Sequence, residues 1–267
     1  MVPISLYDEI EITKAKVNGQ GKNSAERLTV SCDHPLVPQG QENLAYKAAA
    51  LLLKTARSDA RVRIHIRKQI PVGGGLGGGS SDAAATLVGL NRLLKLRFSM
   101  ETLRKLSLSL GADVPFFIRP RPVRARGIGE QLSTLRKLPR LWAVILYPGF
   151  PVPTAWVYRN LPTKLTKPPA NTSINLFLRN ADGLRRLLVN DLETVTLGRY
   201  AELTVLKRRL AEEGAIGALM TGTGSSVFGL FNSRPKAEKA FRRLHRTNGA
   251  EVFLVRVLER IGRSKVR

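Results

Sequence analysis

The chain has 267 residues, enough for one large domain or two ordinary ones, and 43% of them are hydrophobic, which is sufficient for a buried core. No apolar run approaches the roughly eighteen residues of a membrane span, and the amino-terminal residues do not resemble a secretory signal, so we expect a cytoplasmic protein with no membrane partner. The chain has a single cysteine, Cys32, which excludes an internal disulfide. Its histidines, His34, His65 and His245, are scattered, which excludes a Cys/His metal cluster. The formal net charge of +24 favours anionic partners.

Alternating and helical hydrophobic patterns indicate a mixed fold. In chain order, the first half shows a strand at Ile4–Ile12, a strand at Arg27–Cys32, a helix at Asn43–Leu53, a strand at Arg61–Ile66, a helix after a glycine-rich stretch, a helix at Met100–Leu110 and a strand at Phe116–Ile118. The second half shows a strand at Leu141–Tyr147, a loop at 161–173, helices at Leu184–Leu188 and Leu197–Glu213, strands at Ala218–Met220 and Val227–Phe231, a helix at Lys236–Arg246 and a strand at Glu251–Val257. Strands and helices in two clusters predict α+β layers, with an approximate boundary near residue 139.

The strongest functional signal is the stretch Pro71-Val72-Gly73-Gly74-Gly75-Leu76-Gly77-Gly78-Gly79-Ser80-Ser81. A backbone rich in glycine can approach a ligand closely, and its N–H groups, with those of a following helix, can surround an anion. The stretch lies between an alternating strand and an apolar-periodic helix, with Ser80, Ser81 and Asp82 as candidate N-caps of that helix. This context favours a phosphate-binding loop over a flexible linker, because linkers lie between polar runs.

Two common phosphate loops do not fit these residues. A P-loop requires a Lys-Ser/Thr pair after its second glycine, and none is present. A dinucleotide fingerprint expects an acidic residue about twenty positions downstream, where the chain reads Leu93-Leu94-Lys95-Leu96-Arg97-Phe98.

The loop resembles the second motif of the GHMP kinases, a family of small-molecule kinases. Gly111-Ala112-Asp113-Val114-Pro115-Phe116-Phe117 resembles a catalytic-aspartate motif of that family, and Met220–Phe228 resembles its third motif. Arg126–Glu130 and Asn190-Asp191-Leu192-Glu193 also fit. The resemblance implies a two-domain GHMP kinase-like fold, with a ribosomal protein S5 domain 2-like domain at 1–138 and a ferredoxin-like domain at 139–267.

The resemblance also implies the reaction and its residues. ATP would bind Pro71 to Ser81 with Mg²⁺, and Ser80 or Ser81 could help to hold the metal. Asp113 would act as general base towards the 2-hydroxyl of a cytidyl methylerythritol, in the non-mevalonate route to isoprenoid precursors. Position alone favours an ordinary cap or turn aspartate, and the family motif reverses this preference.

Further binding residues follow from the same resemblance. Tyr158 would stack on the cytosine, although a core aromatic is an equal alternative. Gly222, Gly224 and Ser225 would approach substrate or phosphate, although alone they indicate only a tight turn. Asn43 and Lys68 would lie near the nucleotide, with a helix cap and a solvated strand-end lysine as alternatives.

Relatives of this kind normally begin with Pro-Ala-Lys-Ile-Asn-Leu, which supplies a lysine beside the catalytic aspartate, and continue with Gly-Tyr-His, which helps to bind the cytidine. This chain contains neither and begins with residues that resemble the following segment. We expect a start codon assigned too late or a fragmentary gene, because the later motifs are intact. A relative with altered function is the third explanation.

Two other functions remain open at this point. One is another GHMP kinase activity, and the other is a non-catalytic, basic nucleotide- or RNA-binding protein on the same scaffold. The basic residues are spread along the chain, and the densest groups, Lys207–Arg209 and Arg242–Arg246, fall on expected helix surfaces. This spread predicts weak, non-specific nucleic-acid binding at most, and we expect a monomer or homodimer.

Overall fold

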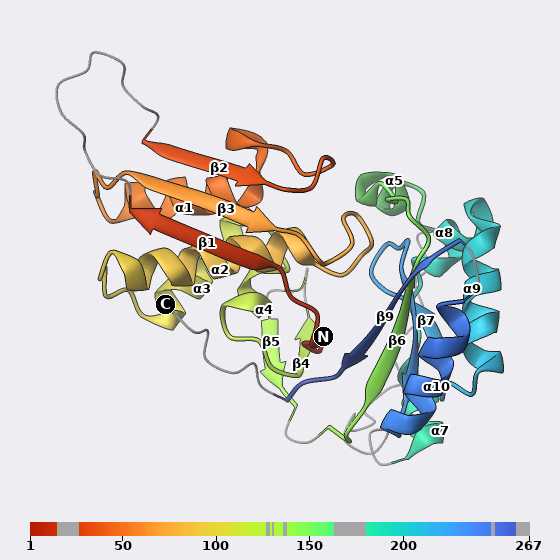
Figure 1. Cartoon of the computed structure of the whole chain (residues 1–267). Helices are drawn as coiled ribbons and strands as arrows, with labels where there is room; N and C mark the ends of the chain where they lie inside the picture. The colour runs from red at the N-terminus through yellow and green to blue at the C-terminus, as the bar shows by residue number, and fades with distance from the viewer. Residues whose placement is uncertain are drawn as a thin grey trace. The chain divides into compact units, whose positions relative to one another are not determined.

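The computed structural model describes residues 1–14, 27–126, 129, 131–135, 138–162, 180–246 and 249–259. The chain folds into two compact units (Figure 1). Unit 1 contains Met1, Leu6–Val72 and Gly77–Thr134, and unit 2 contains Val2–Ser5, Gly73–Leu76 and Leu135–Arg267. The glycine-rich stretch is therefore divided, because Gly73–Leu76 pack with unit 2 and the chain returns to unit 1 at Gly77.

Unit 1 is built on a three-stranded sheet of order β1-β3-β2. Its elements are β1 (Glu9–Lys14), β2 (Leu28–Cys32), the 3-10 helix η1 (Gly40–Glu42), α1 (Leu44–Thr55), β3 (Val62–Arg67), α2 (Gly78–Leu93), α3 (Met100–Ser107), η2 (Leu108–Leu110), α4 (Val114–Ile118), β4 (Val123–Arg126) and β5 (Gln131–Thr134). β3 runs antiparallel to β1 and parallel to β2, while β4 and β5 form a separate antiparallel pair. A parallel pair needs a long crossover, which α1 supplies.

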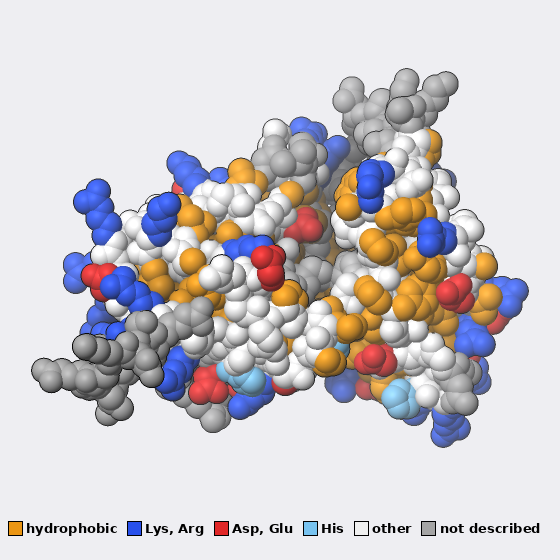
Figure 2. All heavy atoms as spheres, turned by 90° about the horizontal axis from the view of Figure 1, so that it is seen from above, with side chains coloured by type: hydrophobic (Ala, Val, Ile, Leu, Met, Phe, Trp, Pro, Cys, Tyr) orange, Lys and Arg blue, Asp and Glu red, His pale blue; other side chains and the backbone are white. Residues whose placement is uncertain are grey.

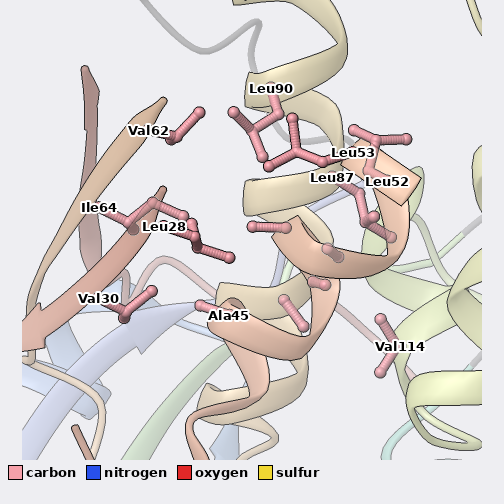
Figure 3. Close-up of a cluster of buried hydrophobic side chains, with 14 of the residues drawn as sticks. Leu28, Val30, Ala45, Leu52, Leu53, Val62, Ile64, Leu87, Leu90 and Val114 are labelled. Atoms are coloured by element: carbon pink, nitrogen blue, oxygen red, sulfur yellow. The ribbon is translucent and has the colours of Figure 1, made fainter. Parts of the chain in front are cut away.

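The sheet of unit 1 has one apolar and one polar face because its strands alternate. In β3, Ile64 and Ile66 are buried, whereas Arg63 and Arg67 are exposed. α1 and α2 cover the apolar face, where the strand residues meet helix leucines such as Leu87 (Figure 3). This helix-on-sheet layer holds the start of α2 in place.

Unit 2 is built on a four-stranded antiparallel sheet of order β7-β8-β6-β9. Its elements are β6 (Trp142–Tyr147), α5 (Thr154–Arg159), α7 (Ala181–Leu187), α8 (Glu193–Arg199), α9 (Ala201–Glu212), β7 (Ala218–Met220), β8 (Val227–Phe231), α10 (Arg234–Leu244) and β9 (Glu251–Arg256). Helices separate β6 from β7 and β8 from β9, which gives the ferredoxin-like order of strands and helices. α9 and α10 contribute Leu203, Leu210 and Ala240 to the core.

The expected α+β fold is confirmed, and most expected strands and helices are present. One assignment is wrong, because residues 116–118 belong to the helix α4 and not to a strand. Pro115 lies in the first turn of this helix, and Val114, Pro115, Phe116 and Ile118 are all buried. A short apolar run that is buried on every side carries no period that separates a strand from a helix.

Several boundaries also differ from expectation. β1 begins at Glu9, whereas Ile4 makes only an isolated bridge to Val257 within unit 2. α2 begins at Gly78, with Gly77 as its N-cap in a left-handed conformation, so Ser80, Ser81 and Asp82 are not N-caps. The short elements η1, β4, β5 and α5 lacked a sequence signal, and the expected helix at Leu197–Glu213 is divided into α8 and α9.

Some expected features lie outside the described residues. The loop at 161–173 does so from residue 163 onwards, and residues 127, 128 and 130 of the Arg126–Glu130 segment do so as well. None of the described helices combines the length and hydropathy that a membrane span requires.

Replacement of Leu87 by Ala tests the core of unit 1. Leu87 is fully buried, so the cavity should cost about 2–5 kcal/mol of unfolding free energy. Leu93→Ala on the same helix is the matched control, because Leu93 is 39% exposed and should cost well below that range. Denaturant unfolding measures the unfolding free energy of both variants. Equal losses would contradict the packing of α2 on the sheet of unit 1.

Candidate active site

The first half of the glycine-rich stretch is held by the turn that joins β7 to β8 in unit 2. The Thr221 hydroxyl donates to the Gly75 carbonyl at 2.9 Å, and the Ser226 amide donates to the Gly74 carbonyl at 3.2 Å. The second and third motifs, far apart in sequence, therefore meet within unit 2.

Only glycine fits at the points of closest approach. Gly75 has a φ of +73°, and a Cβ on it would lie 2.1 Å from the Thr221 carbonyl oxygen. Gly73 has a φ of +70°, and a Cβ there would lie 2.4 Å from the Pro151 side chain. The glycines thus permit both the left-handed backbone and the contact.

The β7–β8 turn is supported by polar side chains from the segment before α8 and from α8 itself. Asn190 donates from one amide nitrogen to the Met220 and Gly222 carbonyls, at 2.9 and 2.8 Å. Glu193 accepts from the Met220 amide at 2.7 Å and pairs with Lys207 at 2.6 Å. Lys207 therefore belongs to this support and is not merely part of a basic helix surface.

The second half of the stretch begins α2 in unit 1. Its first N–H groups have no partner within the helix, which is the usual setting for an anion. A Cβ on Gly79 would meet no atom within 4 Å, so this side of the helix start is open within the described structure. The Ser81 hydroxyl donates back to the Gly78 carbonyl at 2.8 Å.

A buried charge cluster lies beside the start of α2, and we call Asp8, Lys68 and Asp82 the triad. The Lys68 ammonium lies 2.5 Å from Asp8 Oδ2 and 3.0 Å from Asp82 Oδ2, and the three side chains are only 2–5% exposed. Asp8 Oδ1 also accepts from the Gln69 and Ile70 amides, at 2.7 and 2.9 Å. The triad therefore joins the entry to the glycine-rich stretch to its exit.

One ammonium can neutralise only one of two carboxylates, and the triad shows this imbalance. Burial is the main cause that raises the pKa of Asp82 to about 7. The positive charge of Lys68 opposes this rise, and the negative charge of Asp8 adds to it. Burial lowers the pKa of Lys68, but the two carboxylates outweigh burial and the net change is upwards. Lys68 is thus charged at neutral pH, and the alternative of a solvated strand-end lysine is wrong.

Asp113 precedes α4 and makes no side-chain cap hydrogen bond. The residue as a whole is exposed. The protein atoms around its carboxylate nevertheless remove part of its hydration, which raises the pKa of Asp113. The positive charge of the Met1 amino group opposes this rise. A carboxylate with a raised pKa that remains accessible is suited to accept a proton from a bound hydroxyl.

The other expected site residues have differing surroundings. Asn43 caps α1, with its side chain accepting from the Ala45 amide at 2.8 Å, which confirms the cap alternative. Tyr158 on α5 is 59% exposed, so the core alternative is wrong. Ser225 is buried, and its hydroxyl donates to the Phe150 carbonyl.

The comparisons with known proteins agree with this architecture. Residues 43–120 match the GHMP kinases N terminal domain, and residues 173–250 match the GHMP kinases C terminal family. The chain is 43% identical to a 4-diphosphocytidyl-2-C-methyl-D-erythritol kinase of Citrifermentans bemidjiense, over 97% of this chain and 89% of that protein. The chain belongs to the GHMP kinase family.

Solved structures of other GHMP kinases share its fold. A crystal structure of 4-(cytidine 5'-diphospho)-2C-methyl-D-erythritol kinase is 34% identical, with a TM-score of 0.77 over 96% of this chain and 88% of that one. Homoserine kinase from Cytophaga hutchinsonii, at 21% identity and a TM-score of 0.69 over 95% of this chain and 87% of that one, shares the fold alone.

The relatives and the surface do not favour the alternative functions. The relatives named above on identity are enzymes that act on the same cytidyl compound. Lys and Arg side chains are dispersed on the face shown in Figure 2, with no single basic patch there. The candidate site of this GHMP kinase therefore comprises the glycine-rich stretch and Asp113.

Sequence reasoning missed the roles of Asp8, Asn190 and Glu193. Asn190 and Glu193 had been noted within a fitting segment, but nothing in the sequence indicated that they hold the β7–β8 turn. Asp8 carried no signal, because an acid within an alternating strand is usually solvated.

Replacement of Lys68 by Met tests the triad. The variant leaves two buried carboxylates without their cation, so we expect a loss of about 3–5 kcal/mol of unfolding free energy. Arg67→Met is the matched control, because the neighbouring Arg67 pairs with Glu9 while 54% exposed and should cost less than about 1 kcal/mol. Urea unfolding measures the loss of unfolding free energy in both variants. Similar losses in the two would contradict the buried triad.

Replacement of Gly75 by Ala tests the contact with the β7–β8 turn. The positive φ alone should cost about 1–2 kcal/mol, and the contact with Thr221 adds to it, so thermal stability and ATP binding should both fall. Gly198→Ala on α8 has no atom within 4 Å of the new Cβ and should leave both unchanged. Unchanged thermal stability and ATP binding in Gly75→Ala would show that the β7–β8 turn does not hold the glycine-rich stretch.

Proposed function

We propose that this GHMP kinase transfers the γ-phosphoryl group of ATP to the 2-hydroxyl of 4-diphosphocytidyl-2-C-methyl-D-erythritol. The products would be ADP and the 2-phosphate of that compound. The observation that carries this proposal is the 43% identity, over 97% of the chain, to a kinase named for this substrate. The step belongs to the non-mevalonate route to isoprenoid precursors.

The phosphate loop from Pro71 to Ser81 is our proposed ATP site. The open backbone at Gly79 and the amino-terminal N–H groups of α2 suit a polyphosphate. Among the described residues, no group of three or more His, Cys, Asp or Glu is arranged to hold a metal ion. We propose that Mg²⁺ arrives with ATP, because Mg²⁺ is commonly held by phosphates and water, and that a Ser80 or Ser81 hydroxyl is a further ligand.

Asp113 is our proposed general base. Its carboxylate would accept the proton of the substrate 2-hydroxyl while that oxygen attacks the γ-phosphorus and ADP leaves. The Gly129 backbone lies near the carboxylate, since a Cβ on Gly129 would be 3.8 Å from Asp113 Oδ1.

The proposed contact with the cytosine of the substrate is made by α5. The exposed Tyr158 ring offers a face for the cytosine, and stacking on a base is worth about 1–3 kcal/mol. Trp156 on the same helix is only half-buried, and the Arg199 guanidinium lies 4.8 Å from its ring centre. We therefore assign base contact to Tyr158 and not to Trp156.

We propose that the remaining expected site residues support the glycine-rich stretch and do not themselves bind ATP or the substrate. Gly222, Gly224 and Ser225 belong to the turn that holds Gly75. Asn43 and Lys68 direct their side chains to protein partners, so we propose that they support the nucleotide site and do not contact the base. We also propose a domain boundary near residue 139, a cytoplasmic location beside the ATP pool, and a monomer or homodimer.

Replacement of Asp113 by Asn tests the base. Turnover of the cytidyl substrate should fall by about 10²–10⁴-fold, because the proton has no acceptor. In the unaltered enzyme, kcat/KM should rise with pH through the pKa of Asp113, which lies above the ordinary value of about 3.9. A coupled assay for ADP over a pH series measures both.

The stability of Asp113→Asn is the control. The folded state disfavours the ionised form of Asp113, so Asn should not lower stability at neutral pH. Any gain should disappear below about pH 3.9, where the aspartate is protonated in both folded and unfolded chains. Full turnover by a folded Asp113→Asn variant would reject Asp113 as the base.

A further inference from the structure

The β7–β8 turn that holds the glycine-rich stretch also contacts the start of α5. The hydroxyl of Thr154, the first residue of α5, lies 3.2 Å from the Thr223 hydroxyl in that turn, and either group can donate in this hydrogen bond. Thr223 is buried, and the Thr196 hydroxyl of α8 donates to its carbonyl at 3.1 Å. The backbone of Thr223 is thus fixed by α8, while its side chain holds α5.

The segment that leads into α5 contacts the glycine-rich stretch itself. The Val152 amide donates to the Gly73 carbonyl at 3.4 Å, and the Pro151 side chain occupies the space that a Cβ on Gly73 would need. From the β7–β8 turn, the Ser225 hydroxyl donates to the Phe150 carbonyl. Hydrogen bonds therefore join three segments of unit 2, which are the first half of the glycine-rich stretch, the segment before α5 and the β7–β8 turn.

α5 depends on such contacts because it is short. Isolated helices of fewer than roughly twelve to fifteen residues are marginal in water, and α5 has six. Among these six only Val157 is buried, and the Trp156 ring packs edge-on against Tyr200 with ring centres 6.4 Å apart. Tyr158, the proposed contact of the cytosine, is exposed. The position of Tyr158 therefore depends on how firmly the start of α5 is held.

We propose that Thr154 and Thr223 are positioning residues that couple the binding of the cytidyl substrate to the binding of ATP. The proposal rests on the proposed function, with Tyr158 as the contact of the cytosine and the glycine-rich stretch as the ATP site. Substrate bound to α5 restrains that helix, and the hydroxyl pair transmits the restraint to the turn that holds Gly75. ATP then binds a stretch that is already ordered, so each ligand raises the affinity for the other.

The coupling is reciprocal, and the share of the hydroxyl pair in it is bounded. The factor by which the substrate raises the affinity for ATP equals the factor by which ATP raises the affinity for the substrate. One neutral hydrogen bond changes an equilibrium constant by about two- to tenfold, so loss of the pair should reduce the coupling factor by that amount. The hydrogen bonds of Val152 and Ser225 do not involve the Thr223 side chain, so they remain in its variants.

Calorimetric titration of the full chain tests the proposal. A non-hydrolysable ATP analogue with Mg²⁺ is titrated into the protein alone and into the protein saturated with 4-diphosphocytidyl-2-C-methyl-D-erythritol. The ratio of the two dissociation constants is the coupling factor, and the titration in the reverse order must give the same value. Direct contacts between the two ligands are common to all variants, so the comparison of variants isolates the contribution of the hydroxyl pair.

Thr223→Val removes the hydroxyl and keeps the shape of the side chain, so we expect its coupling factor to be about two- to tenfold smaller. Its affinity for the analogue alone should stay within about twofold, because the backbone of the turn is held by other groups. Thr223→Ser keeps the hydroxyl and should restore the coupling. Thr204→Val, on the exposed face of α9, is the matched control and should change nothing.

The exposed Thr154 provides the same test from the other side and covers the case in which Thr223→Val fails to fold. Thr154→Val should lower the coupling as much as Thr223→Val, and the double variant should lower it no further, because both remove one hydrogen bond. An unchanged coupling factor in either single variant, or equal losses in Thr223→Val and Thr223→Ser, would overturn the proposal.

A second measurement uses the unaltered chain and follows the restraint itself. The Ser226 amide donates to the Gly74 carbonyl, so its hydrogen exchange reports how firmly the turn and the glycine-rich stretch are joined. The cytidyl substrate, added without nucleotide, should slow this exchange by about two- to tenfold. Unchanged exchange with the substrate bound overturns the coupling alone. Absence of substrate or analogue binding to the folded chain overturns the proposed function as well.

Discussion

The close approach of Gly75 to the β7–β8 turn is the contact on which the candidate site depends. A side chain at Gly75 would lie 2.1 Å from the Thr221 carbonyl oxygen, so the loop can take its course only without one. Asn190 and Glu193 hold the other side of that turn through backbone groups of Met220 and Gly222. The first half of the glycine-rich stretch is thus shaped by a chain of hydrogen bonds that begins at Asn190 and Glu193.

The second half of the site depends on charge and not on close packing. Lys68 lies between two buried carboxylates beside the first turn of α2, where desolvation makes each charge costly unless it has a partner. Such a triad contributes less to stability than an apolar core of equal volume would. It places a cation beside a helix start suited to a polyphosphate, which is a reason for a kinase to retain it.

The sequence alone predicted the site in outline because its motifs are local. The glycine-rich stretch, the Asp113 segment and the Gly222–Gly224 turn each carry their signal within a few residues. The α+β class and most strands followed from hydrophobic period for the same reason. Asp113 and Tyr158 could be named as candidates from the family resemblance, and their roles stay proposals.

The sequence by itself thus determined the family and most of the elements, and it named the candidate residues for the chemistry. Only the tertiary structure decided what those residues contact: that α2 begins at Gly78, that residues 116–118 are helical, and that Lys68 is buried between Asp8 and Asp82. The physical reason is that hydrophobic period and glycine content act between near neighbours. Burial and ion pairing instead depend on residues far apart in the chain, such as Asp8 and Lys68, which no local pattern brings together.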